Sequence, residues 1–219
     1  APERQQTLRG AIAWSYKLLS EIEQGVFRRL AVCISGCTLD AAERICEGIG
    51  GVIGGVEGLF AILEALVDKS LLRYQLQDRE EARFWMLQTL REYGLECLAH
   101  EGETAKARNA HALYYLAWME QAAPYLVGAE QTDWLDRVAQ EYENIRAALH
   151  WMLSEAATHT QEEQAEWAGR AMRLCAALSE FWEVRGYFNE GSRFLERALA
   201  VGEGVTPSVR AEAIYNASF

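Results

Sequence analysis

The sequence LLRYQLQDREEARFWM, at residues 71–86, decides the fold class of the first half of the chain. Residues 71–76 and 84–86 are mainly aliphatic or aromatic, whereas QDREE at 77–81 contains only polar and charged side chains. Short aliphatic and aromatic segments on either side of a polar turn are typical of two strands joined by a tight connection. The stretch therefore predicts a β-hairpin.

Helical patterns surround this hairpin. Ser20 and Glu23 have the spacing of a capping box, and Thr38 is a suitable N-cap for another helix. With the apolar periodicity, these signals predict helices over residues 7–19, 20–31, 38–46, 57–69 and 89–100. Three helices followed by a hairpin are the winged-helix arrangement.

A glycine-rich stretch, GIGGVIGGVEG, occupies residues 48–58. A phosphate-binding loop needs GxxxxGK[ST], and this stretch has no Lys, Ser or Thr. The dinucleotide fingerprint GxGxxG is broken at Ile53, and a helical pattern rather than a strand precedes it. We therefore predict a flexible connection between two helices.

From Glu103 onward the apolar pattern is helical only. Two long helices, over 105–122 and 131–154, are separated by a break that contains Pro124 and Gly128. Long helices joined by a short connection pack as an antiparallel pair.

The next helix pair has the spacing of a tetratricopeptide repeat over residues 175–198. Small residues are needed where two helices cross closely, and Gly191 and Ala198 supply them. Large residues must fill the space beside the crossing, and Trp182 and Leu195 supply those. This pair predicts a tetratricopeptide-like packing of helices.

We therefore expect a mainly α protein. A winged-helix domain with a short β-hairpin, preceded by its linker helix, is expected over residues 1–100, and a tetratricopeptide-like helical domain over 101–219. A helix over 209–219 begins like another repeat and stops before its partner helix. We therefore expect the second domain to be truncated and the chain to be a fragment of a longer protein.

The charge and hydropathy of the chain argue against several partners. Lys and Arg total 21 and Asp and Glu total 32, so the net charge is -11, opposite to that of surfaces that bind nucleic acid. No apolar run approaches the roughly 20 residues that span a bilayer, and the N-terminus APERQQTLRG lacks a signal-peptide pattern. We expect a soluble, cytoplasmic protein without direct contact to membranes or nucleic acid.

The cysteines favour buried, reduced thiols over a metal site. They are Cys33, Cys37, Cys46, Cys97 and Cys175. A structural zinc site takes four ligands in two closely spaced pairs, and no His lies between residues 1 and 99. We expect no metal in this chain.

The side chains also argue against catalysis and DNA reading. The four histidines lack HExxH or GxSxG contexts. The expected helix over 56–69, at the place of a DNA recognition helix, carries three carboxylates and one lysine, whereas base readout draws on Arg, Lys, Asn and Gln. We expect that this chain is not an enzyme.

Taken in order, several segments resemble a known family, the bacterial signal-transduction ATPases with numerous domains (STAND, NB-ARC type). These include large LuxR-type and AfsR-like transcriptional regulators, and the resemblance is to the part that follows their nucleotide-binding module. The segments are RQQTLR at 4–9, WSY at 14–16, FRRLAV at 27–32, LVDKSLL at 66–72, FWMLQTLREYGLE at 84–96, ENIRAALHW at 143–151 and FNEGSRFLERAL at 188–199.

The resemblance implies that the winged helix packs on an ATPase core of the same polypeptide, upstream of this chain, and that ATP or ADP is held there. No cofactor is implied within the chain itself. Plant and animal relatives carry a Met-His-Asp motif whose His lies near the ADP β-phosphate. The matching residues here are Met86, Leu87 and Gln88. Leu87 excludes direct phosphate contact by that side chain. The resemblance then implies that the winged helix restrains the ATPase core through packing alone.

The resemblance further implies that the helical repeats sense a protein or small-molecule inducer and so switch the ATPase. Our candidates for partner contact are Arg185, Tyr187 and Arg193, beside the repeat turn, because Tyr and Arg are frequent in interfaces. A stand-alone protein-interaction scaffold is the alternative, and a DNA-binding winged helix is a further one.

Overall fold

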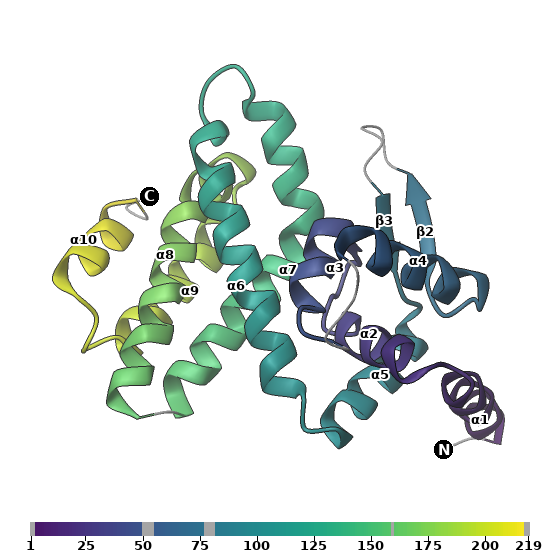
Figure 1. Cartoon of the computed structure of the whole chain (residues 1–219). Helices are drawn as coiled ribbons and strands as arrows, with labels where there is room; N and C mark the ends of the chain where they lie inside the picture. Colours follow the sequence, from purple (N-terminus) through teal and green to yellow (C-terminus); the bar gives the residue numbers. More distant parts are fainter. Residues whose placement is uncertain (1–2, 50–54, 77–81, 159, 217–219) are drawn as a thin grey trace. The chain divides into compact units, whose positions relative to one another are not determined.

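A computed structural model of the chain describes residues 3–49, 55–76, 82–158 and 160–216 (Figure 1). It divides into two compact units, Ala1–His111 and Ala112–Phe219. The division falls within one helix, α6 (Thr104–Ala122). As predicted, the described residues are mainly helical and include a small sheet and a winged-helix domain.

Besides the start of α6, the first unit contains helix α1 and the helices and strands of the winged helix. They are α1 (Glu3–Lys17), α2 (Glu21–Leu30), β1 (Cys37–Thr38), α3 (Leu39–Ile45), α4 (Gly55–Asp68), β2 (Arg73–Leu76), β3 (Ala82–Trp85) and α5 (Gln88–His100). The predicted capping box is confirmed, since the Ser20 backbone N–H donates to Glu23 Oε2 at 2.8 Å and the Glu23 N–H donates to Ser20 Oγ at 3.3 Å. Thr38 caps α3 in the same way, through the Ala41 N–H at 3.2 Å.

The sheet has the strand order β1-β3-β2, with both pairs antiparallel. Strands β2 and β3 form the predicted hairpin, in which Tyr74 lies opposite Phe84; the turn predicted at 77–81 lies outside the described residues. Strand β1 has only two residues and was not predicted. It pairs through Cys37 and Phe84.

The chain turns sharply at Gly36, just before β1. Gly36 has φ +77, and a Cβ there would lie 2.4 Å from the carbonyl oxygen of Phe84. The buried side chain of Arg83 supports the same turn, because its Nε donates to the Ser35 carbonyl at 3.0 Å. Glycine at this position therefore allows β3 to approach the backbone of the turn.

The helix predicted over 57–69 is present but begins two residues earlier than predicted, within the glycine-rich stretch. Helix α4 begins at Gly55 and includes Gly58. It is held by burial of Leu59, Leu63 and Leu66, and packing of an apolar face outweighs the low helix propensity of glycine. The part of the predicted loop at 50–54 lies outside the described residues.

An ion pair joins α2 to the residue before α6. Arg28 Nε donates to Glu103 Oε2 at 2.8 Å, and both side chains are mostly buried. The Arg28 guanidinium holds the pKa of Glu103 below its usual range. Because the folded pKa lies below the unfolded one, this stabilisation is present above the unfolded pKa and is lost as pH falls through the folded pKa.

We therefore expect Glu103→Gln to lower the free energy of unfolding by about 1 kcal/mol near neutral pH. The difference from the unsubstituted protein should be smaller at about pH 3, below the ordinary glutamate pKa, because the stabilisation is lost as pH falls through the folded pKa of Glu103. Urea titrations at both pH values measure it. Glu64→Gln, an exposed carboxylate in the same unit, is the control and should change stability at neither pH. A difference for Glu103→Gln that does not depend on pH contradicts the assignment.

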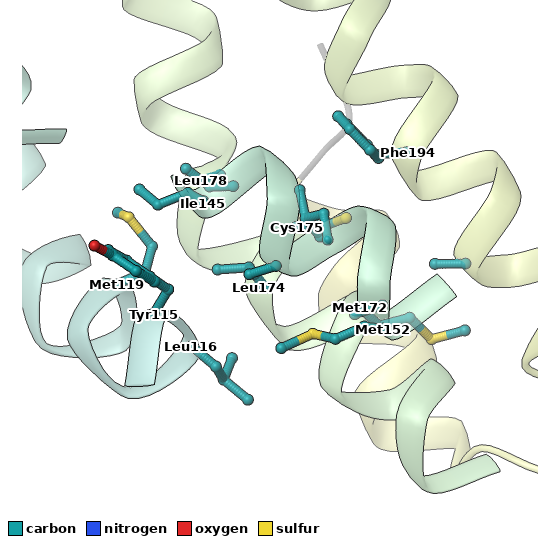
Figure 2. Close-up of a cluster of buried hydrophobic side chains, with 14 of the residues drawn as sticks. Tyr115, Leu116, Met119, Ile145, Met152, Met172, Leu174, Cys175, Leu178 and Phe194 are labelled. Atoms are coloured by element: carbon teal, nitrogen blue, oxygen red, sulfur yellow. The ribbon is translucent and has the colours of Figure 1, made fainter. Parts of the chain in front are cut away.

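The second unit consists of helices only within its described residues. Besides the end of α6, they are η1 (Ala123–Leu126), α7 (Gln131–Thr158), α8 (Gln161–Arg185), α9 (Phe188–Val201) and α10 (Pro207–Asn216). Helix α8 packs against α7, α9 and α10. Figure 2 shows how Leu174, Cys175 and Leu178 of α8 meet side chains from the neighbouring helices, such as Ile145 and Phe194.

The predicted close crossing of α8 and α9 is confirmed. Gly191 and Ala198 are buried, and a Cβ on Gly191 would lie 2.5 Å from Cε3 of Trp182, which is completely buried. Among the other tryptophans of this unit, Trp167 is buried, whereas Trp134 and Trp151 are half-buried.

Four of the five cysteines are buried, and all five are free thiols. Burial raises the pKa of Cys175 to about 12 and raises the pKa of Cys46 as well. Cys97 is half-buried.

No helix in the described part of the chain is both long enough and apolar enough to cross a membrane.

Candidate functional site

Helix α4 occupies the position of the recognition helix in a helix-turn-helix, and its exposed face is acidic. Glu57, Ala61, Glu64 and Asp68 are all exposed, and their spacing of three or four residues places them on one face of the helix. The three carboxylates form no hydrogen bond or ion pair with a described residue. Lys69, which follows, forms an ion pair with Glu23. We call Glu57, Glu64 and Asp68 the acidic face.

This acidic face repels phosphate. A DNA-binding surface gains most of its affinity from cations that neutralise phosphates and most of its specificity from donors on base edges. Three carboxylates on the face that would enter the major groove contribute neither. The acidic face suits contact with the polar or basic surface of a protein.

Of the three residues that the resemblance aligns with the Met-His-Asp motif, Met86 and Leu87 connect β3 to α5, and Gln88 is the first residue of α5. Met86 is half-buried, and Gln88 Nε2 donates to Glu92 Oε1 at 3.0 Å within α5. Leu87 is the N-cap of α5, with extended backbone and no side-chain capping bond, and it is 43% exposed. An apolar side chain thus lies open on the surface where a polar cap would ordinarily stabilise the helix.

Two of the three candidates in the second unit flank Gly186, where α8 ends in a left-handed conformation. Arg185 forms an ion pair with Asp136 of α7. Tyr187 stacks on Tyr142, with ring centroids 5.2 Å apart and planes 15° apart. Both side chains therefore already have partners in the structure.

Arg193, the third candidate, lies on α9 and is exposed. No hydrogen bond or ion pair within the described residues joins it to Arg185 or Tyr187. The structure thus brings Arg185 and Tyr187 to one turn, and Arg193 lies further along α9.

Tyr187 packs against a partly buried polar network that the sequence did not predict. The Tyr142 hydroxyl accepts from Trp182 Nε1 at 2.7 Å and donates to Glu190 Oε2 at 2.9 Å. Arg146 Nε lies 2.7 Å from Glu190 Oε1. Burial raises the pKa of Tyr142, so its hydroxyl stays protonated and can donate at neutral pH. The network ties α7, α8 and α9 together.

This network stabilises the helices rather than performing chemistry. The Tyr142 hydroxyl both donates and accepts, and the charge of Glu190 is compensated by Arg146. The only sequence signal for this network is the ENIR segment at 143–146, beside Tyr142. The pattern of one helix cannot show which distant helix supplies the partner of a polar side chain.

Comparison with known protein families agrees with the winged-helix fold of the first unit. Residues 19–99 match the family described as "Winged helix-turn-helix domain", and these residues include α2, the whole sheet and almost all of α5. The chain carries a winged helix-turn-helix domain. No solved structure matches the chain.

Relatives named as regulators match almost the whole chain. The "Putative HTH-type transcriptional regulator Rv0890c" of Mycobacterium tuberculosis (strain ATCC 25618 / H37Rv) is 32% identical over 98% of the chain. The "Putative HTH-type transcriptional regulator Mb0914c" of Mycobacterium bovis matches equally well. A further relative, "Uncharacterized protein Rv0894" of M. tuberculosis, is 35% identical over 45% of the chain and 24% of its own length.

The chain spans 23% of the length of the curated regulators it matches. Its winged helix and these homologues support a regulatory role. They do not support the expectation that the chain makes no direct contact with nucleic acid.

Proposed function

We propose that this chain is the restraining and sensing segment of a larger transcriptional regulator of the STAND type. In this proposal the winged helix holds a nucleotide-binding core closed, and the helices of the second unit bind a protein or small-molecule inducer. The chain itself is not an enzyme and holds no cofactor, and ATP or ADP is held elsewhere in the parent polypeptide.

The acidic face of α4 is the observation that carries this proposal. It turns the helix that would read DNA into a surface for protein contact, and it lies in the same unit as the exposed Leu87. An exposed apolar side chain beside polar ones is a common element of protein contacts. The relatives, about four times longer than the matched region, have room for further domains.

A switch of this kind needs an inducer that binds the open and closed states with different affinity. Such coupling is typically worth about 1–3 kcal/mol, or about 5- to 150-fold in an equilibrium. The exposed leucine offers a direct test, because it contributes to restraint only if it contacts the nucleotide-binding core.

In the intact polypeptide, Leu87→Asp should accelerate release of bound nucleotide by about fivefold or more. Aspartate is a good N-cap, so the substitution should leave α5 as stable as before or more stable, and the faster release is then not caused by unfolding. Release of a fluorescent ADP analogue measures the rate, and circular dichroism checks the fold.

Leu113→Asp is the matched control, because Leu113 is 40% exposed and lies in the second unit. It should leave the release rate unchanged. Equal rates for the unsubstituted protein and Leu87→Asp would refute the restraint and favour a stand-alone scaffold without a switching role.

Direct DNA binding is the second candidate, favoured by the winged helix-turn-helix match and by the names of the regulators. We expect fluorescence anisotropy to show no sequence-selective binding of duplex DNA at about 0.15 M salt. Changing Glu57, Glu64 and Asp68 together to Gln should strengthen non-selective binding, since repulsion of phosphates is removed. Selective binding by the unsubstituted chain, weakened by changes on α4, would establish DNA reading instead.

A further inference from the structure

A cavity of about 410 Å³ opens in the second unit, where the end of α6 and η1 meet α8 and α10. Its wall is built from small apolar side chains, including Ala123, Ala176 and Val209, and it carries three charged groups, Glu120, Arg173 and Glu212. This volume is within the usual range for small-molecule sites. All of these residues belong to one compact unit.

Two of the three charges neutralise each other. Arg173 donates from Nε to Glu120 Oε1 at 2.7 Å and from the terminal nitrogen to Glu120 Oε2 at 2.8 Å. Such a bidentate pair fixes both side chains. An anionic ligand could bind Arg173 only by displacing the Glu120 carboxylate, which already accepts its hydrogen bonds.

Glu212 is the remaining charge. It is exposed on α10, and it makes no hydrogen bond or ion pair with any residue that the structure describes. The unit around it is acidic, since residues 112–219 contain 16 Asp and Glu and 8 Lys and Arg. Such a field raises the local concentration of cations.

We propose that this cavity binds an alkylammonium group, with the ammonium at Glu212 and the alkyl stem against the small apolar wall. The inference rests on the proposed sensing function and names its ligand chemistry. The group can belong to a free amine or to a lysine side chain. A chain of three or four methylenes on an ammonium is short enough to lie within the cavity, and both sources supply it.

Titration of the full chain with butylammonium, followed by NMR chemical shifts of α8 and α10 amides, tests the inference. Butylammonium should bind, whereas butyrate and 1-butanol, which have the same alkyl chain and a different head group, should bind at least about tenfold more weakly. Glu212→Gln should weaken butylammonium binding by about tenfold.

Glu203→Gln is the matched control. Glu203 is also exposed and lies near α10 in sequence, but it does not line the cavity, so butylammonium binding should be unchanged. Preference for butyrate, equal binding of 1-butanol, or equal weakening by both substitutions would each overturn the proposal.

A lysine diamide, blocked at both ends, separates the two sources. Binding tighter than that of butylammonium assigns the site to a lysine side chain of a protein, and weaker binding assigns it to a free amine. Nucleotide release from Leu87→Asp needs no ligand in this cavity, so a failed titration leaves the proposed restraint to be judged by that separate measurement.

Discussion

Replacing Gly191 with alanine should lower the free energy of unfolding by about 2 kcal/mol. The new methyl group would lie 2.5 Å from Trp182 Cε3 and 2.8 Å from Cδ2, and this ring is completely buried between helices. The ring cannot move aside without breaking its hydrogen bond to Tyr142. Chemical denaturation of the whole chain, followed by far-UV circular dichroism, measures the loss.

Gly169→Ala is the matched control for this prediction. Gly169 lies in the same unit within α8, and a Cβ there would meet Val205 at 3.7 Å, an ordinary contact. It should therefore stabilise the protein by about 0.5–1 kcal/mol, the difference in helix propensity.

A double substitution tests the cause of the Gly191→Ala effect. Trp182→Leu destabilises the unit by itself but removes the ring, so adding Gly191→Ala to it should cost clearly less than Gly191→Ala does alone. Strict additivity of the two changes would show that the contact with Trp182 is not the cause.

Gly36→Ala should destabilise the first unit by about 3 kcal/mol. Alanine at φ +77 is strained, and its Cβ would lie 2.4 Å from the Phe84 carbonyl oxygen and 2.8 Å from Trp85 Cβ. Since the first of these atoms is backbone, β3 itself must shift. Thermal unfolding and hydrogen exchange of the β3 amides measure the effect.

Gly102→Ala separates backbone strain from the collision. Gly102 has φ +69, and nothing lies within 4 Å of a Cβ there, so only the conformational cost of about 1 kcal/mol remains. Equal losses for the two variants would show that the approach of β3 contributes nothing at Gly36.

The features that were predicted correctly are those set by neighbours in sequence. The capping box at Ser20 and the N-cap at Thr38 depend on residues three positions away, and all three hydrogen bonds are present. The hairpin follows from a polar turn between apolar segments. The crossing at Gly191 was predictable because close helix packing leaves only small residues at the contact.

The features that were missed depend on residues far away in sequence. Strand β1 is defined by its pairing with β3, 47 residues later, and two residues carry no periodicity. Helix α4 begins at Gly55, two residues before its predicted start, because Leu59, Leu63 and Leu66 after it are buried. A composition rich in glycine indicates a loop only where burial does not oppose it.

The candidate site residues show the same limit. Arg185 and Tyr187 were selected as exposed side chains beside a turn, but their partners, Asp136 and Tyr142, are 49 and 45 residues earlier in the chain. The cavity beside Glu212 draws its wall from four helical segments, and no single segment indicates it. Only the acidic character of α4 could be predicted directly, because it depends on one helix.

The buried thiols provide the chain with built-in probes of local opening. A cysteine reacts with alkylating reagents as the exposed thiolate, and the buried Cys175, with its pKa raised to about 12, is neither exposed nor ionised in the closed fold. Labelling of Cys175 therefore reports opening of the second unit, and labelling of Cys33, Cys37 and Cys46 reports opening of the first. Mass spectrometry of a single timed alkylation reaction can thus follow local opening of both units at once, with no dye, tag or substitution added to the molecule.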